Sequence, residues 1–534
     1  MMRKLRAKRV LRNRKSNSNS FQENIHQQSP SGQPYFTDDL EQNINQILSV
    51  IGNSPDFILR HIETGTQDRP VKAAIVYIDG LVDTADLGEL VINPLLYETS
   101  NKIKQLPVSH ETIDLIEKHV LSLSEIKRVN SIPKAINDAL RGNSILIIDG
   151  QNTALSCSTQ GFETRSIQEP TIETVIRGPK EGFTENIRTN IAQLRRKISS
   201  PDLKLEEMNI GKYSQTKVVI AYVSTIVTPG LVSEVRERLS EIDIDGVMDS
   251  GYIEQLIEDA PYSLFPTIGN TEKPDVTATR LLEGRVAILV DGSPMVLTVP
   301  RLFWEVIQSP EDYYSRPFNS SAVRLIRLLF LIVSVVLPGF YVAVLNFHPE
   351  MIPRILVVTL AAAEEGVPFP LVVEVILFGL AFEGLREAGV RLPRPVGSAV
   401  TIVGALIIGQ ATVEAGLVSS STVIVTAFIG IASFITPGIG DIFIITRLVL
   451  VLLSGFLGLF GLIMGGLIFY IHMCSLRSFG VPYVSPLAPV RLKEWKDLII
   501  RAPLWLLDTR PNYVGSTNKH RMGSKMRPEP PNSE

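Results

Sequence analysis

The sequence of 534 residues predicts an α/β domain of two similar subdomains, followed by an all-α polytopic membrane domain. Short β-branched runs that end in Asp-Gly recur in roughly the first 320 residues, each after a helical pattern. Three long apolar runs follow between residues 323 and 474. An apolar stretch of about 18 residues is long enough to cross the hydrocarbon core of a bilayer. We therefore expect a membrane protein with a large domain on one side.

Six segments are expected along the chain. The first fifteen residues hold eight Lys or Arg and no acid, and they lack the apolar core of a signal peptide. A solvated tail and attraction to anionic lipid on the cytoplasmic leaflet are both open interpretations of this run. The segments are a basic and polar disordered tail (1–36), a first α/β subdomain (37–165), a linking helix region (166–215), a second α/β subdomain (216–317), a membrane domain of four to six apolar segments (318–474), and a tail with an interfacial amphipathic helix (475–534).

The composition excludes several classes of function. A net charge of −3 indicates no nucleic-acid partner, and the two cysteines, Cys157 and Cys474, form no disulfide framework. The seven histidines have no metal-ligand spacing, and no phosphate loop, dinucleotide fingerprint or nucleophile elbow occurs. We expect no enzymatic activity, no cofactor and no metal, and a reducing, cytoplasmic setting for the soluble part.

A repeated pattern predicts the two α/β subdomains, roughly over 71–158 and 216–300. Each copy has a strand, a helix, a linking segment, a second helix and a hairpin whose Asp-Gly turn accepts positive φ. Convergent turn chemistry is the alternative to a true repeat. The expected elements are strand Lys72–Asp79, helices Leu87–Leu95 and Pro133–Arg141, and hairpin Ile145–Asp149 with Thr153–Ser156; then strand Lys217–Val223, helices Leu231–Ile242 and Val276–Glu283, and hairpin Val286–Asp291 with Met295–Val299.

Between the copies, Glu181–Ile198 is expected to form one helix. Ile187, Ile191 and Leu194 would share its apolar face, and basic residues lie near or on the other. We expect either a bridging helix on which the subdomains pivot or a rigid spacer.

Basic residues near the ends of the apolar runs predict the orientation of the membrane domain. They flank the first run and precede the third, whereas residues 416–421 carry no charge. Both the soluble domain and the C-terminal tail are therefore expected in the cytoplasm. The basic residues are Arg316, Arg324 and Arg327 at the first run, and Arg386, Arg391 and Arg394 before the third.

The number of crossings does not follow directly from the apolar runs. Ile442–Ile471 holds about 30 residues, too long for one upright helix and too short for two joined by a loop. Met351–Ala363 is too short to span and is expected to be re-entrant or interfacial. Because a cytoplasmic tail needs an even number, we expect four full crossings with one or two broken segments. Gly461 and Gly465 form a small-xxx-small pair, a weak indication of oligomerisation.

Carboxylates within apolar segments are the candidate functional residues. Glu374 and Glu383 lie in Val367–Arg386, where an unpartnered carboxylate in hydrocarbon costs at least about 2.5–3.5 kcal/mol. A local pair of Glu383 with Arg386 is the alternative to an ion path, whereas Glu374 has no cation three or four residues away.

Glu374 and Glu383 are nine residues apart, which places them about 180° apart on a regular helix. Both can line one lumen only if the helix breaks, for example at Gly379. In the next segment, Gln410 and Glu414 lie on one face. These four polar side chains predict a path for cations.

Residues 490–507 alternate Arg and Lys with Leu, Ile and Trp, which is typical of a helix lying in a membrane interface. The candidate interface residues are Trp495, Trp505, Lys493 and Lys496. Packing on the soluble domain is the alternative.

Several stretches are distinctive when taken together. They are 178–183 (GPKEGF) with Glu185, Asn190, Leu194 and Arg195, 263–267 (SLFPT), 281–291, 348–353 (HPEMIP), and 382–396 (FEGLREAGVRLPRPV) continuing through Gly416. With these stretches the chain resembles, over about residues 40–510, the A subunits of the GerA-type spore germinant receptors of endospore-forming bacteria.

The resemblance implies a receptor of three components in the spore inner membrane. These are this A subunit, a transporter-like B subunit thought to hold the nutrient, and a lipoprotein C subunit. It also implies that A subunits form a homo-oligomeric, nutrient-gated ion channel whose opening starts germination. The candidate coupling residues at the linking helix are Glu181, Gly182, Phe183, Glu185, Asn190 and Arg195.

Three other functions remain open. The stage V sporulation protein AF shares the membrane half, although the long basic, polar N-terminal extension favours the receptor subunit. A secondary transporter would be favoured by an inverted repeat in the membrane half, but the repeat lies in the soluble half. A passive scaffold would only anchor its partners.

Overall fold

The fold is described from a computed structural model. The described residues are 34–52, 54–66, 69–98, 111–161, 169–170, 173, 175–391, 404, 407–435, 440–514, 517–523 and 526–528. The basic run at 1–15 and Arg394 lie outside them, whereas Phe36, expected at the end of the tail, packs in a hydrophobic core. The chain divides into two compact units, Met1–Ile167 with Phe183–Met208, and Gln168–Gly182 with Asn209–Glu534.

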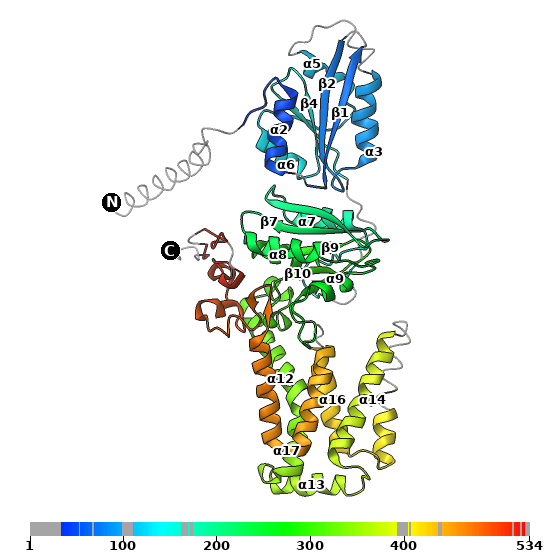
Figure 1. Cartoon of the computed structure of the whole chain (residues 1–534), viewed down its shortest axis with the longest axis vertical. Coiled ribbons are helices and arrows are strands. Elements are labelled where there is room, and N and C mark those ends of the chain that lie inside the picture. Colours follow the sequence, from blue (N-terminus) through cyan, green and yellow to red (C-terminus); the bar gives the residue numbers. More distant parts are fainter. Residues whose placement is uncertain are drawn as a thin grey trace, which may run out of the picture. The chain divides into compact units, whose positions relative to one another are not determined.

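The first unit contains a five-stranded antiparallel sheet with helices on both faces (Figure 1). Because successive side chains of a strand point to opposite faces, Ala74 and Val76 pack under α2 and α6, while Ala73 and Ile75 pack under the segments at 84–98 and 111–120. The strand order is β1-β2-β4-β5-β3. The elements are α2 (Leu40–Ile51), β1 (Phe57–Thr66), β2 (Arg69–Ile78), α3 (Thr84–Asp86), η1 (Leu87–Ile92), η2 (Pro94–Glu98), α5 (Glu111–Leu115), η4 (Ile116–Val120), β3 (Ile126–Val129), α6 (Ile132–Ala139), β4 (Ser144–Ile148) and β5 (Ala154–Cys157).

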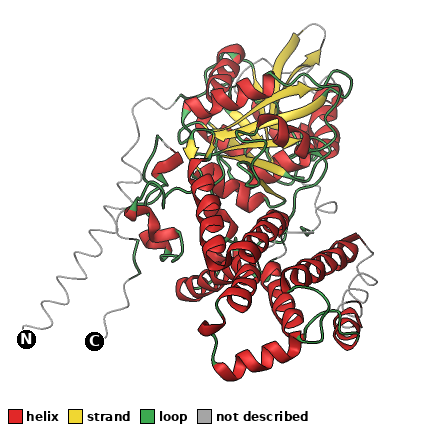
Figure 2. Ribbon diagram, turned by 60° about the horizontal axis from the view of Figure 1, so that its bottom comes forward, coloured by secondary structure: helices red, strands yellow, loops and turns green. Residues whose placement is uncertain are grey.

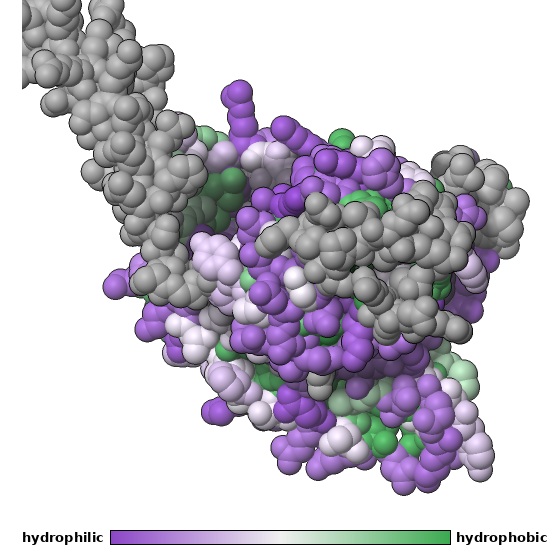
Figure 3. All heavy atoms as spheres, turned by 90° about the horizontal axis from the view of Figure 1, so that it is seen from above, coloured by the Kyte–Doolittle hydropathy of each residue, from purple (hydrophilic) through white to green (hydrophobic). Residues whose placement is uncertain are grey.

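The second sheet repeats the same strand order. It runs β6-β7-β9-β10-β8, so in both sheets the third strand of the copy lies at the edge beside the fifth. Both expected Asp-Gly turns are present, with φ of 76° at Gly150 and 85° at Gly292. Two similar α/β subdomains are thereby confirmed. The elements are β6 (Leu203–Ile210), β7 (Thr216–Val223), α8 (Pro229–Ser240), α9 (Ser250–Ile257), β8 (Gly269–Thr271), α10 (Pro274–Leu282), β9 (Val286–Val290) and β10 (Val296–Val299). Where described atoms face the reader in Figure 3, hydrophilic side chains predominate.

A buried asparagine extends the repeat to the helix before each sheet. Asn43 of α2 accepts from the backbone N–H of Thr37 at 2.8 Å and donates to its carbonyl at 2.7 Å. In α7 (Ile187–Lys197), Asn190 makes the same two bonds to Thr184, at 2.8 and 2.6 Å. In chain order, α7 is therefore the counterpart of α2.

The expected helix over 181–198 is six residues too long at its start. Asn186 caps the helix by accepting from the backbone N–H of Arg188 at 2.9 Å, so Ile187 is the first helical residue. An Asn at this position has extended backbone geometry, which separates the preceding residues from the helix.

The rest of the second unit is mainly helical, in contrast to the sheets (Figure 2). By length and composition, α12 and the Ile442–Ser475 part of α17 are long and apolar enough to cross a membrane. The helices are α12 (Pro317–Phe347), α13 (Arg354–Glu364), α14 (Leu371–Arg391), a helical stretch at 407–414, α16 (Ser420–Phe434) and α17 (Gly440–Ser475).

α17 consists of two arms that reverse direction at Gly458. This residue has φ 61° and ψ −144°, which no helix contains. A Cβ placed on Gly465 would lie 2.8 Å from a methyl carbon of Leu450, although fifteen residues of straight helix would separate them by about 22 Å. The run is expected to be too short for two segments joined by a loop, and it forms two arms because one glycine replaces the loop. Gly461 and Gly465 serve close packing of the two arms within one chain.

The helical segments alternate in direction between two ends. Gly404 approaches Leu385, Gly416 approaches Gly366, and Gly458 approaches Phe347 at the end of α12. Within the described ranges, α12, α14, the stretch at 407–414, α16 and the two arms of α17 therefore make six alternating segments. The residue after α17 thus returns to the end at which α12 began. α13 lies across the opposite end (Figure 1) and exposes Ile355, Leu356 and Val358 among other apolar residues.

The segment after α17 packs where the end of the second α/β subdomain meets the helices. Tyr483 and Leu498 pack with Trp304 and with Leu331 of α12 in one buried cluster. The continuous amphipathic helix expected over 490–507 does not form. It is replaced by two 3-10 turns, η8 (Leu492–Asp497) and η9 (Leu504–Leu506), since Pro503 is extended and has no N–H to continue a helix.

Candidate functional site

Glu374 lies at the amino-terminal end of a neighbouring helix. It is 1% exposed, and its Oε1 accepts from both the backbone N–H and the hydroxyl of Ser419, each at 2.6 Å. Ser419 is the N-cap of α16, so the carboxylate faces the positive end of that helix. Close by, the hydroxyl of Tyr341 lies 2.9 Å from Ser421 Oγ and 3.3 Å from Thr422 Oγ1. Oxygen atoms from three helices therefore gather around one buried carboxylate.

Glu383 is neutralised by two arginines. Its Oε2 lies 2.7 Å from Arg386 Nε, so the local pair expected from the sequence is formed. Its Oε1 lies 3.2 Å from Arg447 Nη1 in the first arm of α17, and Arg447 also donates to the carbonyl of Ser334 at 3.1 Å. The cluster of Glu383, Arg386 and Arg447 has one negative and two positive charges and ties α14 to α12 and α17.

Glu374 and Glu383 do not meet. α14 runs without interruption from Leu371 to Arg391, so Gly379 does not break the helix. The two carboxylates consequently face different neighbours, the start of α16 for Glu374 and α17 for Glu383.

Gln410 and Glu414 form an exposed polar pair. Gln410 Nε2 donates to Glu414 Oε1 at 2.8 Å, one helical turn further along. Both side chains are exposed on a helical stretch whose other residues, except Thr412, are apolar. In a single chain, these polar groups therefore face away from the bundle.

The candidate coupling residues divide into buried anchors and surface groups. Arg195 is 1% exposed and makes a bidentate pair with Asp56, at 2.7 Å from Nε and 3.2 Å from Nη2. It also donates to the carbonyl of Leu203 at 2.9 Å. Gly182, Phe183 and Asn190 are buried, Glu181 is half-buried and Glu185 is exposed. Arg195 and Asn190 hold α7 in place within the first unit.

A buried cluster of ion pairs at the start of α12 was not predicted from the sequence. It consists of Arg324, Arg327, Asp312 and Asp497 and is called the joint below. Arg324 lies 2.6 Å from Asp312 of α11 (Glu311–Tyr314) and 2.8 Å from Asp497 in the segment after α17. Arg327 joins the same Asp312 at 2.9 Å. In the sequence these arginines indicated orientation only, and nothing in the local spacing pointed to Asp497, which is 173 residues from Arg324.

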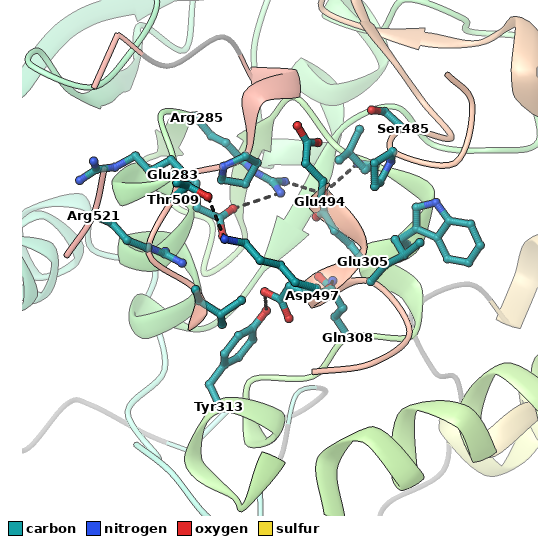
Figure 4. A pocket seen from close by; sticks show the side chains of 18 residues that line it. Glu283, Arg285, Glu305, Gln308, Tyr313, Ser485, Glu494, Asp497, Thr509 and Arg521 are labelled. Atoms are coloured by element: carbon teal, nitrogen blue, oxygen red, sulfur yellow. Dashed lines mark hydrogen bonds and ion pairs between the residues drawn. The ribbon is translucent and has the colours of Figure 1, made fainter. Parts of the chain in front are cut away.

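A small charged cavity of about 60 Å³ lies beside this joint (Figure 4). Glu305 on its wall lies 2.5 Å from Arg285 and 3.0 Å from Arg280. Burial opposes its ionisation, but Arg285, Arg280 and Arg301 together lower the pKa of Glu305 to about 2. Burial raises the pKa of Glu283 on the same cavity. Acidic and basic side chains both line the cavity, so it favours neither cations nor anions.

Three of the four candidate interface residues are exposed. Trp495 and Trp505 are each 38% exposed, and Lys493 is also at the surface. Lys496 instead binds nearby residues of the same segment. Its Nζ donates to the carbonyl of Leu506 at 3.1 Å and lies 2.9 Å from Asp508 Oδ1.

Within the described part of the chain, no three His, Cys, Asp or Glu side chains come together to hold a metal ion. The polar groups found so far are hydroxyls, carboxylates and arginines at helix contacts. A family model described as "Bacillus/Clostridium GerA spore germination protein" matches residues 43–513. The chain belongs to the GerA spore germination protein family.

Two proteins of Bacillus subtilis match this chain over most of their length. The chain is 46% identical to spore germination protein KA of Bacillus subtilis (strain 168), over 92% of this chain and 89% of that protein. It is 38% identical to spore germination protein B1 of the same organism, over 89% and 96%. As a GerA-family A subunit it is a receptor protein and not an enzyme.

One further relative is described by its location. The uncharacterized membrane protein YfkQ of Bacillus subtilis (strain 168) is 38% identical over 92% of this chain and 94% of its own. Together with the apolar helices, this relationship makes the GerA-family chain a membrane protein. A crystal structure of the N-terminal domain of the A subunit of the Bacillus megaterium spore germinant receptor GerK3 has 38% identity and a TM-score of 0.42, covering 51% of this chain and 98% of that one.

Proposed function

We propose that this chain is the A subunit of a nutrient germinant receptor that triggers spore germination, and that several copies assemble into a nutrient-gated cation channel. The exposed pair of Gln410 and Glu414 carries this proposal. A carboxylate facing lipid costs at least about 2.5–3.5 kcal/mol, and a glutamine side chain is also unfavourable there. An assembly in which this helix face lines water or meets another subunit removes that cost.

The cluster around Glu374 supports a route for cations. Carboxylate and hydroxyl oxygens are the ligands that hard cations prefer. Ser419, Ser421, Thr422 and Tyr341 supply such hydroxyls beside Glu374. Glu383 is the weaker candidate for the path because Arg386 and Arg447 already neutralise it.

The proposed location is the spore inner membrane, with the α/β subdomains and the C-terminal segment in the cytoplasm. The six alternating helical segments support this, since an even number returns the chain to its starting side. Arg316, Arg324 and Arg327 at that end fit the excess of basic residues on cytoplasmic sides. The proposed partners are a transporter-like B subunit, a lipoprotein C subunit and anionic lipids.

The proposal is tested with the complete receptor, purified with its B and C subunits and reconstituted in liposomes that contain a K⁺-sensitive dye. A panel of amino acids, sugars and nucleosides is added from outside. We expect nutrient-dependent K⁺ flux that Glu414→Gln reduces strongly and Glu374→Ala also reduces. Glu387→Gln is the matched control, because Glu387 is exposed and pairs with Arg391, one helical turn along, at 2.5 Å.

Each other result identifies a different function. Uptake of the nutrient itself, coupled to an ion, would indicate a secondary transporter. Assembly without flux or uptake would indicate a scaffold or a modulator of the kind represented by the stage V sporulation protein AF. Normal assembly and an unchanged nutrient response in Glu374→Ala would remove that residue from the path.

A further inference from the structure

The segment that follows α17 exposes a run of apolar and aromatic side chains. Leu492 is 70% exposed and Ile500 is 66% exposed, and both tryptophans of the segment reach the surface. Such exposure is not needed for packing on the α/β subdomain, since buried Leu498 already packs with Phe303 and Trp304 there. The exposed members are Val490, Leu492, Trp495, Ile500, Leu504, Trp505 and Leu506.

Hydrogen bonds to α12 fix the height of this segment relative to the membrane helices. The backbone N–H of Arg501 donates to Ser321 Oγ at 3.0 Å, and Arg324 donates to the carbonyl of Asp497 at 3.1 Å. Ser321 lies four residues, about 6 Å along the helix, before Leu325. From Leu325 onward, exposed apolar residues begin to repeat on α12, with Leu325 58% and Leu329 56% exposed.

That height corresponds to the headgroup region of a bilayer. The polar layer on each side of the hydrocarbon core is about 5–8 Å thick. If the exposed apolar surface of α12 marks the start of the hydrocarbon, Ile500 lies at the level of the lipid headgroups. Exposed Phe318, one turn before Ser321, lies at the same end of the helix. Exposed apolar side chains of α12 and of the segment are thus found near the same end of the helix.

The basic residues of the segment indicate that it binds anionic lipid. Arg491 and Lys493 are exposed beside Leu492 and Trp495. Tryptophan rings and long basic side chains are the residues that settle at the membrane–water interface, where the rings are half wet and the cations meet lipid phosphates. Exposed cations attract anionic headgroups over roughly the Debye length of about 8–10 Å.

We propose that residues 490–506 form a foot that lies in the headgroup layer of the cytoplasmic leaflet and binds anionic lipid. The occupant of the exposed apolar surface is therefore lipid, and not a second copy of the chain or another subunit. The lipid contact requires the proposed membrane orientation but not ion conduction, so either proposal can fail without the other.

The test uses the three tryptophans of the complete chain in liposomes. Three variants each retain one tryptophan and replace the other two with phenylalanine. Trp304 is the matched internal control, because it is 8% exposed and its indole N–H donates to the carbonyl of Val484 at 3.0 Å. Phospholipids brominated near the headgroup end or deep in the acyl chains quench tryptophans that touch lipid at the corresponding depth.

We expect shallow bromines to quench Trp495 and Trp505 strongly, deep bromines to quench them less, and Trp304 to be unaffected. Replacing phosphatidylglycerol with phosphatidylcholine, or introducing R491Q and K493Q together, should remove most of the shallow quenching. The two charge substitutions lie on exposed side chains, so the fold and the Trp304 signal are retained.

Two results would contradict the proposal that residues 490–506 contact the lipid headgroups. If Trp495 and Trp505 are quenched no more than Trp304 but are accessible to aqueous acrylamide, the segment faces water. If they are shielded from both bromine and acrylamide, another protein surface covers them. Shallow quenching in liposomes without any ion flux would retain the foot and reject the channel.

Discussion

Arg324 of α12 and Asp312 of α11 form an ion pair that is almost completely closed to solvent. Nε and Oδ2 are 2.6 Å apart, and the two side chains are 0% and 2% exposed. Arg324 also reaches Asp497 at 2.8 Å. One guanidinium thereby connects the end of the second α/β subdomain, the first membrane helix and the segment after the last one. Any relative movement of these three elements must rearrange this joint.

Replacing Arg324 with methionine is expected to lower the free energy of unfolding by about 3 kcal/mol. Loss of one partner leaves a buried charge, which typically costs about 3–5 kcal/mol. We expect the lower end of this range of energies, because Arg327 still neutralises Asp312. Its Nη1 lies 2.9 Å from Asp312 Oδ1. Denaturant unfolding of the purified protein in detergent measures the change. Arg316→Met, at an exposed position eight residues earlier, should have no comparable effect, and equal losses in both variants would contradict the role of the joint.

Gly458→Ala is expected to destabilise the helical hairpin of α17 by about 1–3 kcal/mol. The backbone at φ 61° and ψ −144° is close to a region that glycine alone occupies readily. An added Cβ would also lie 3.0 Å from Cβ of Phe347. Gly466→Ala is the control, since nothing lies within 4 Å of its added Cβ. The shift of the denaturation midpoint of the purified protein in detergent measures the loss, and an equal shift in Gly466→Ala would contradict the role of Gly458.

Asn43→Ala and Asn190→Ala are expected to have similar costs, each about 1–3 kcal/mol. Both side chains are 0% exposed, and each satisfies a backbone N–H and a carbonyl six residues earlier. An unsatisfied buried polar group has a penalty of that size. Hydrogen exchange at the amides of Thr37 and Thr184 should accelerate in the respective variants. Asn152→Ala, at an exposed turn, should leave both amides unchanged.

The stabilising contribution of Glu305 is expected to disappear in acid. Its pKa in the folded protein is about 2, held down by arginines against the effect of burial, compared with about 4.3 for a free glutamate. A lowered pKa stabilises the fold above pH 4.3, and that contribution, about 3 kcal/mol, declines as the pH falls from 4.3 through 2. Unfolding of wild type and Glu305→Gln should differ at pH 7 and converge toward pH 2.

Glu283 lines the same cavity, but its ionisation is expected to change the free energy of unfolding in the opposite direction. Burial raises its pKa, so its ionisation at neutral pH weakens the fold, and the stability it contributes is lost as the pH rises through the raised pKa. Glu283→Gln should therefore be neutral or stabilising at pH 7. A loss as large as that of Glu305→Gln would show that its pair with Arg285, at 3.3 Å, outweighs burial.

The sequence predicted the features that depend on neighbouring residues. The Asp-Gly turns at Gly150 and Gly292 and the pair of Glu383 with Arg386 follow from local spacing, and the structure contains all three. Long apolar runs likewise indicated α12 and α17. Local geometry determines these features, so tertiary contacts did not overrule them.

Features that depend on distant partners were missed. β1 and β3 have mixed sequences that become strands only through their pairing with β2 and β5. The hairpin in α17 depends on a single glycine among several in the run, and its φ is known only in the folded chain. Likewise, Arg447 meets Glu383 across 64 residues, a pairing that no spacing rule reveals.

The packing of Tyr483 and Leu498 against Trp304 and Ile307 means that this cluster is completed late during synthesis. Trp304 and Ile307 leave the ribosome about 180 residues before Val484, the acceptor of the Trp304 indole hydrogen bond. All of the helices from α12 to α17 are made in the interval. The cluster around Trp304 therefore stays incomplete until the membrane helices have been synthesised, and a chain that stops at Ser475 leaves Trp304 and Ile307 without Tyr483, Val484 and Leu498.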